Sequence, residues 1–217
     1  MVTRTMTTAE RFAQPPEQFL DGRWRVPRFT RRDTEDLVRL GIIPEDASTE
    51  LLDGLVVLKD RAATGEDPFM IGKNHCKAVE RLSDLRTRIS DGRRHVQSQQ
   101  PLVCSETHAP EPDFAVIRGT LDGYDDLPAA SDAFSVVEVA DASYERDSGE
   151  KRVGYARAGV AQYIILNLRN RTAEVYTHPD TSAGSYASLH VVAEDQSLLL
   201  RVGESEFFPV ALADILP

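Results

Sequence analysis

One acidic residue lies in the middle of an apolar segment of the sequence. Glu138 interrupts the run Val136-Val137-Glu138-Val139-Ala140, and a carboxylate in a buried strand is costly unless it is paired or binds a cation. Asp113 follows Pro112 and precedes a second apolar segment, Phe114-Ala115-Val116-Ile117. Two acids on adjacent core strands can converge on one point, and such a point suits Mg²⁺ or Mn²⁺, which prefer hard oxygen ligands.

A divalent cation held in this way suits the hydrolysis of a phosphodiester. The cation stabilises charge that develops on the phosphate and lowers the pKa of a bound water, and a nearby ammonium can orient that water. Lys151, between Glu150 and Arg152, is the candidate for the ammonium. Taken alone, each residue has an ordinary reading, because Pro-Asp is common at strand starts and most helical lysines are solvated. Their combination favours a metal-dependent hydrolytic site.

The elements before these residues are predicted from caps, turns and periodicity. Thr30 and Asp33 form a capping-box pattern at a helix start, and Gly41 ends that helix. The Asp53-Gly54 pair separates two short apolar runs and predicts a hairpin over residues 50–58. Apolar residues at helical spacing predict one long helix over residues 68–89.

The elements that carry the candidate residues are mostly strands. The continuous apolar run at residues 134–139 is typical of a central buried strand, and residues 149–158 read as a helix with Gly159 as its C′ residue. An acidic loop is expected between residues 119 and 131. Further strands are predicted over residues 95–103, 112–117, 162–166, 171–176, 188–192 and 197–200. The pattern predicts an α/β fold with mixed strand pairing.

Length and composition indicate one domain with a loose arm. The chain has 217 residues, 41% of them hydrophobic, which is enough to bury a core. Residues 1–28 are predicted to be a flexible arm and residues 29–217 the domain. The apolar runs are too short to span a membrane and the start has no signal-type apolar region, so we expect a cytoplasmic protein. Cys76 and Cys104 are predicted to be buried free thiols.

The net charge of −10 argues against a protein that coats nucleic acid non-specifically, although a cation site needs carboxylates in any case. Two basic segments offset this charge locally. The first lies within residues 23–32, with Trp24 and Phe29 interleaved, and could contact nucleic acid, lie in solvent or bridge subunits. The basic residues of the two segments are Arg23, Arg25, Arg28, Arg31 and Arg32, followed by Arg81, Arg86, Arg88, Arg93 and Arg94.

Several stretches of the sequence resemble the Uma2 family, also called DUF820, of restriction-endonuclease-like proteins in the PD-(D/E)xK nuclease superfamily. The resemblance covers about residues 29–216, and its most specific block runs from Val137 to Tyr163. The matching stretches are Glu50-Leu51-Leu52-Asp53-Gly54, Pro110-Glu111-Pro112-Asp113-Phe114-Ala115-Val116, Val137-Glu138-Val139-Ala140-Asp141, Asp147-Ser148-Gly149-Glu150-Lys151, Tyr155-Ala156-Arg157-Ala158-Gly159-Val160 and Gln162-Tyr163.

The resemblance implies a restriction-endonuclease-like core, with a mixed central β-sheet flanked by helices, and a role for each matching residue. Asp113 and Glu138 would be metal-binding carboxylates, and Glu50 would be an additional acidic ligand. The lysine that general nuclease patterns place two positions after the glutamate is absent, because this position is Ala140. In the Uma2-like arrangement Lys151 would supply it from the following helix.

The same resemblance implies Mg²⁺ or Mn²⁺ as cofactor, DNA as substrate and a homodimer. Two questions stay open. His75, at the start of the long predicted helix, could cap the helix, contact the site or lie at the surface. The fold could also serve as a catalytically inactive or accessory nucleic-acid-binding module, an alternative that the acidic net charge motivates.

Overall fold

The computed structural model describes residues 27–217 apart from residues 46, 48 and 59–71. The predicted arm over residues 1–28 therefore lies almost wholly outside the described residues, as does Trp24. Within the described residues, no helix is both long enough and apolar enough to cross a bilayer.

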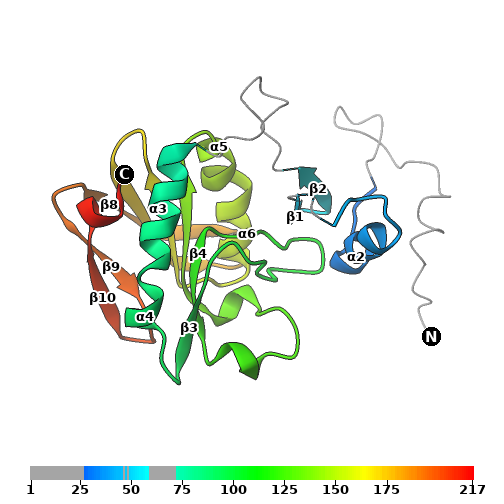
Figure 1. The fold of residues 1–217 in the computed structure, drawn as a ribbon, viewed down its shortest axis with the longest axis horizontal. Coiled ribbons are helices and arrows are strands. Elements are labelled where there is room, and N and C mark those ends of the chain that lie inside the picture. Colours follow the sequence, from blue (N-terminus) through cyan, green and yellow to red (C-terminus); the bar gives the residue numbers. More distant parts are fainter. Residues whose placement is uncertain (1–26, 46, 48, 59–71) are drawn as a thin grey trace.

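A six-stranded sheet forms the centre of the described structure, as predicted for a mixed α/β fold (Figure 1). The strand order is β3-β4-β5-β6-β7-β8, and each neighbouring pair is antiparallel except the parallel pair of β5 with β6. The strands are β3 (Arg94–Gln97), β4 (Phe114–Arg118), β5 (Ala133–Ala140), β6 (Gln162–Asn167), β7 (Thr172–Asp180) and β8 (Ser185–Ala193).

The parallel pair requires a crossover connection, because a chain that leaves one end of β5 must return to the opposite end of the sheet to begin β6. This crossover consists of α5 (Tyr144–Arg146), a π-helical turn (Asp147–Lys151) and α6 (Arg152–Arg157). Gly159 follows with a φ of +79°, as expected for a C′ glycine. The helix predicted over residues 149–158 thus begins earlier and is not uniform.

Each face of the sheet carries its own hydrophobic core. One face packs against α3 (Lys73–Ser83), α4 (Arg86–Ile89), β9 (Ser197–Arg201), β10 (Phe207–Ala211) and α7 (Leu212–Ile215). The other face includes Val136 and Ala140 of β5 and the buried rings of Tyr155, Tyr163 and Tyr176. Strand alternation explains the division, because Val137 and Val139 lie on the first face. Glu138 lies between them and therefore faces the second core.

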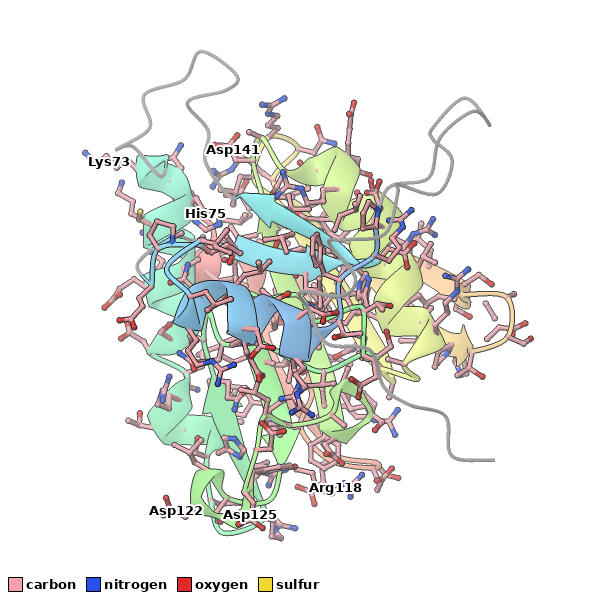
Figure 2. The ribbon with its side chains drawn as sticks, turned by 90° about the vertical axis from the view of Figure 1, so that its right-hand side faces the viewer. Lys73, His75, Arg118, Asp122, Asp125 and Asp141 are labelled. Carbon is pink, nitrogen blue, oxygen red and sulfur yellow. The ribbon has the colours of Figure 1, made fainter. Side chains whose placement is uncertain are left out.

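The N-terminal elements follow their sequence signals closely. Thr30 caps α2 (Arg31–Arg39), and Asp33 completes the predicted capping box. The hairpin of β1 (Thr49–Leu52) and β2 (Leu55–Leu58) turns at Asp53 and Gly54, both with positive φ, as a type I′ turn requires. In Figure 2 this hairpin crosses in front of the sheet, with α3 on one side and α6 on the other.

Some predicted elements differ from the structure. The helix predicted over residues 68–89 is broken at Asp84 and Leu85, which separate α3 from α4, and residues 68–71 lie outside the described part. The strand predicted over residues 95–103 ends at Gln97. Cys76 is exposed on α3 rather than buried, and Cys104 is half-buried. The helical spacing of the apolar residues survives the break, which explains why periodicity alone did not reveal it.

Candidate active site

Glu138 is buried in the sixth position of β5, with 2% of its surface exposed. Its carboxylate oxygen Oε1 accepts two hydrogen bonds from α6 and the preceding turn. Lys151 Nζ donates at 3.0 Å and the Tyr155 hydroxyl donates at 3.0 Å. The acid that interrupts the apolar run is therefore paired, as the sequence requires for a buried carboxylate.

Lys151 is the cation around which these acids gather. Its Nζ lies 2.8 Å from Glu50 Oε1, 3.0 Å from Glu138 Oε1 and 3.9 Å from Asp147 Oδ1. The lysine ends the π-helical turn in which Gly149 has a non-helical backbone (φ −102°, ψ −106°). Such turns are frequent at functional sites, and here Lys151 is buried against the sheet rather than exposed to solvent.

Glu50 reaches the cluster from the β1–β2 hairpin, which is not part of the central sheet. The hairpin is attached to the chain segment before β4, because Leu51 pairs with Ala109 and the Glu111 backbone N–H donates to Glu50 Oε1 at 2.9 Å. A second attachment is the Asp53 backbone N–H, which donates to His108 Nδ1 at 3.2 Å. These hydrogen bonds place Glu50, which is distant in sequence, beside Lys151.

Asp113 immediately precedes β4, and its carboxylate bonds to the neighbouring strand. Phe114 pairs with Val137 in the β4–β5 register, so Asp113 stands next to Glu138 where the β4 ladder begins. The Val139 backbone N–H donates to Asp113 Oδ2 at 2.8 Å, and His75 Nε2 lies 3.2 Å from the same oxygen. The side chain thus takes the place of a strand carbonyl and ties α3 to β5.

The charges of the cluster are unbalanced. Burial raises the pKa of Glu138 well above its usual range, Lys151 lowers it in part, and the neighbouring acids raise it further. Burial likewise raises the pKa of Asp147. Burial alone would lower the pKa of Lys151, but the attraction of Glu138, Glu50 and Asp147 outweighs it and raises that pKa. Four buried carboxylates therefore share one ammonium in the described part of the chain.

Asp113 behaves differently from the other acids. Burial by itself would raise its pKa, but the hydrogen bonds from His75 and the Val139 backbone, with the charge of Lys151, hold the pKa below its usual range. An ionised carboxylate can only accept hydrogen bonds. His75 Nε2 is therefore the donor in the contact with Asp113.

The donor set fits a hard divalent cation. Mg²⁺ is commonly bound by one or two carboxylates together with waters and substrate phosphate, and Asp113 and Glu138 supply two carboxylates from neighbouring strands. The excess of buried carboxyl groups over ammonium groups is a second observation in favour of a cation, because a bound cation would allow those groups to ionise. Within the described residues, His, Cys, Asp and Glu side chains form no group of three arranged to hold a metal ion by themselves, so water and substrate would complete the coordination.

The structure brings together most of the residues that the sequence singles out and adds three more. Lys151 contacts Glu50 and Glu138 directly, while Asp113 joins them through strand pairing and charge. His75, whose place was left open, contacts the site. Asp147 and Tyr155 were not assigned a role, although both lie in the matching stretches and both lie four residues from Lys151, the spacing that places side chains on one helix face.

The basic segments are largely engaged within the protein. Arg31 forms a two-pronged ion pair with Asp126, at 2.8 and 2.7 Å, and Arg28 donates to the Asp53 carbonyl at 2.7 Å. Arg93 and Arg94 both pair with Glu206. These cations are partly neutralised by neighbouring acids. Arg23 and Arg25 lie outside the described residues.

Comparisons with known proteins agree with the fold. The family model described as "Uma2: Putative restriction endonuclease" matches residues 35–211. A solved structure of a putative nuclease belonging to DUF820 from Anabaena variabilis is similar over 82% of this chain and 96% of that chain, with a TM-score of 0.59 and 14% sequence identity. No curated protein matches the sequence. Because the family model covers most of the chain, including every residue of the cluster, this protein belongs to the Uma2 family.

Proposed function

We propose that this protein is a Mg²⁺- or Mn²⁺-dependent endonuclease that hydrolyses phosphodiester bonds in DNA. The observation that carries the proposal is the group of buried carboxylates, Glu50, Asp113, Glu138 and Asp147, around one ammonium. A fold does not need this arrangement for stability, because buried ion pairs are often no better than apolar packing. The family supports the nuclease class, since its model is described as a restriction endonuclease.

Each residue has a distinct part in the proposed reaction. Asp113 and Glu138 would hold the metal, with Glu50 as an additional ligand, and the metal would stabilise charge on the phosphate and acidify a bound water. Lys151 would keep the carboxylates together and offer its positive charge to the reacting phosphate. Tyr155 would hold Glu138 through its hydroxyl. Burial raises the pKa of Tyr155, so that hydroxyl keeps its proton and remains a donor.

The test is cleavage of supercoiled plasmid and of single-stranded DNA, and of RNA of the same sequence, with Mg²⁺ or Mn²⁺ and with EDTA. We expect metal-dependent cleavage of DNA by the wild-type protein and none by Asp113→Asn. Asp122→Asn makes the same chemical change in an exposed 3₁₀ turn (Leu121–Gly123) and should cleave like wild type. Equal cleavage by Asp113→Asn would assign the activity to a contaminant. Preference for RNA would overturn the DNA assignment alone.

A second candidate function follows from how completely Lys151 is engaged. Its ammonium already bonds to both Glu50 and Glu138, so the cluster could serve as an internal clamp in an accessory nucleic-acid-binding module without catalysis. The absence of calorimetric Mn²⁺ binding, together with lower thermal stability in Glu138→Gln, would favour this function. Tight Mn²⁺ binding that is lost in Glu138→Gln would exclude it.

A further inference from the structure

The Asp113 carboxylate is held at one oxygen by two different elements. His75 Nε2 from α3 and the Val139 backbone N–H from β5 both bond to Oδ2, at 3.2 and 2.8 Å. Both of these hydrogen bonds end on Oδ2 and neither involves Oδ1. The His75 and Asp113 side chains are buried, with 7% of His75 and 9% of Asp113 exposed. The arrangement leaves one oxygen bound to the protein and the other directed elsewhere.

The two donors differ in what they can control. The Val139 N–H belongs to the backbone of β5, so it fixes the distance of the carboxylate from the strand. A single hydrogen bond still allows the carboxylate to rotate and exchange its oxygens, because the last torsion of an Asp side chain is broad. The bond from His75 comes from another direction, out of the first turn of α3, and removes that freedom. Figure 2 shows His75 next to Lys73 at the start of this helix.

The other ring nitrogen shows that packing alone does not explain this histidine. His75 Nδ1 is buried and has no hydrogen-bond partner among the described residues. Buried polar atoms are nearly always partnered, and an exception calls for an explanation. A histidine kept for stability would be replaceable here by an apolar side chain of similar size. Among the described residues, the ring of His75 makes its polar contact with Asp113.

We propose that His75 is a positioning residue that holds Asp113 Oδ2, so that the other oxygen of this carboxylate is presented to the divalent cation. The inference rests on the proposed function, in which Asp113 is a metal ligand. Hydrogen bonds to ligating groups from the surrounding shell orient the ligands, and their loss commonly weakens metal affinity about 10- to 100-fold. His75 itself does not contact the cation or the substrate in this assignment.

The test compares two substitutions at position 75 that separate hydrogen bonding from packing. His75→Phe keeps a planar ring and removes the donor, whereas His75→Gln keeps an N–H group near the position of Nε2. Calorimetry with Mn²⁺ alone should show affinity about 10- to 100-fold weaker in His75→Phe and largely restored in His75→Gln. His190→Phe is the matched control, because His190 is exposed on β8, and its affinity should equal that of the wild type.

The outcomes separate this inference from the proposed function. If the wild type binds Mn²⁺ and His75→Phe binds it equally well, the positioning role is wrong and the metal site stands. If the wild type binds no Mn²⁺, both fall. A metal-free measurement adds an independent readout: nitrogen NMR of His75 should show a proton on Nε2 in the wild type and a shifted signal in Asp113→Asn. A proton on Nδ1 alone would overturn the assignment.

Discussion

Lys151 bridges two acids from opposite parts of the chain, with its Nζ 2.8 Å from Glu50 Oε1 and 3.0 Å from Glu138 Oε1. Glu50 comes from a separate hairpin and Glu138 from the central sheet, so this contact joins the two. The ammonium therefore has a structural effect as well as the chemical one proposed for it. Both effects can be measured.

Replacing Lys151 by Met should lower the free energy of unfolding by about 3–5 kcal/mol, because the change leaves buried carboxylates without their cation. Urea unfolding of the wild type and the variant measures the difference. The double variant Lys151→Met, Glu138→Gln should recover part of the loss, since one of the unpaired charges is then gone. A loss below about 1 kcal/mol, the range of exposed ion pairs, would mean that the cluster is solvated.

The raised pKa of Glu138 predicts a pH dependence of stability in metal-free protein. Above the unfolded pKa of about 4.5, the unfolded chain loses this proton while the folded chain keeps it, so the wild type should lose stability as pH rises. The slope for one proton is at most about 1.4 kcal/mol per pH unit. Glu138→Gln does not titrate and provides the reference.

Urea unfolding in EDTA at several pH values between about 5 and 8, the range in which proteins are usually most stable, measures this difference. The stability of the wild type minus that of Glu138→Gln should fall across the range until the folded pKa is passed. A difference that stays flat between about pH 5 and 8 would show that Lys151 dominates and that the folded pKa of Glu138 is not raised.

The Tyr155 hydroxyl should matter more than an ordinary buried tyrosine hydroxyl. Tyr155→Phe removes a donor to Glu138, and once the pH has passed the raised pKa of Glu138 this hydrogen bond to a charged group should contribute about 1.5–3 kcal/mol. Tyr163→Phe is a matched control, because its ring packs 5.1 Å from that of Tyr155 and its hydroxyl donates to the backbone carbonyl of Asp147. That neutral bond should contribute about 1 kcal/mol. Equal losses in chemical denaturation would argue that Glu138 is protonated.

Gly154 leaves room for His108, the residue that holds the β1–β2 hairpin through Asp53. A Cβ at Gly154 would lie 2.1 Å from His108 Nε2, and His108 accepts from the Asp53 N–H. Gly154→Ala should therefore destabilise the protein by about 1–3 kcal/mol, as overpacking does. In a His108→Ala background the same change should be neutral or stabilising, because alanine favours helix over glycine. Destabilisation of equal size in both backgrounds would contradict the steric explanation.

The sequence predicted the strands and the acids better than the connections between them. Glu138 could be located because an acid in an apolar strand stands out, and the hairpin because Asp53-Gly54 is a strong turn signal. The contact of His75 with Asp113 could not, since 38 residues separate them and no periodicity relates a helix start to a strand start. The break at Asp84 and Leu85 was hidden for a similar reason, because both segments bury the same face.

The role of Lys151 shows the limit of local reasoning most clearly. Resemblance pointed to this residue, but the predicted helix over residues 149–158 did not show which of its faces meets the sheet. Lys151 ends the π-helical turn and bonds to Glu138, as does Tyr155 one helical turn later. Local propensity does not reveal such a turn, because it depends on how α6 packs on the sheet and on the Tyr163 bond to the Asp147 carbonyl.

That turn concerns the number of residues in the crossover as well as their identity. A π-helical turn holds one residue more than the α-helical turn it replaces. Removing one residue between Asp147 and Lys151 should let a regular α-helix form while Lys151 keeps its direction relative to α6. Within a regular helix such as α6, the same deletion would rotate the preceding side chains by about 100°. The crossover should therefore tolerate the loss of one residue at this turn, but not in α6, with Lys151 still facing the acids.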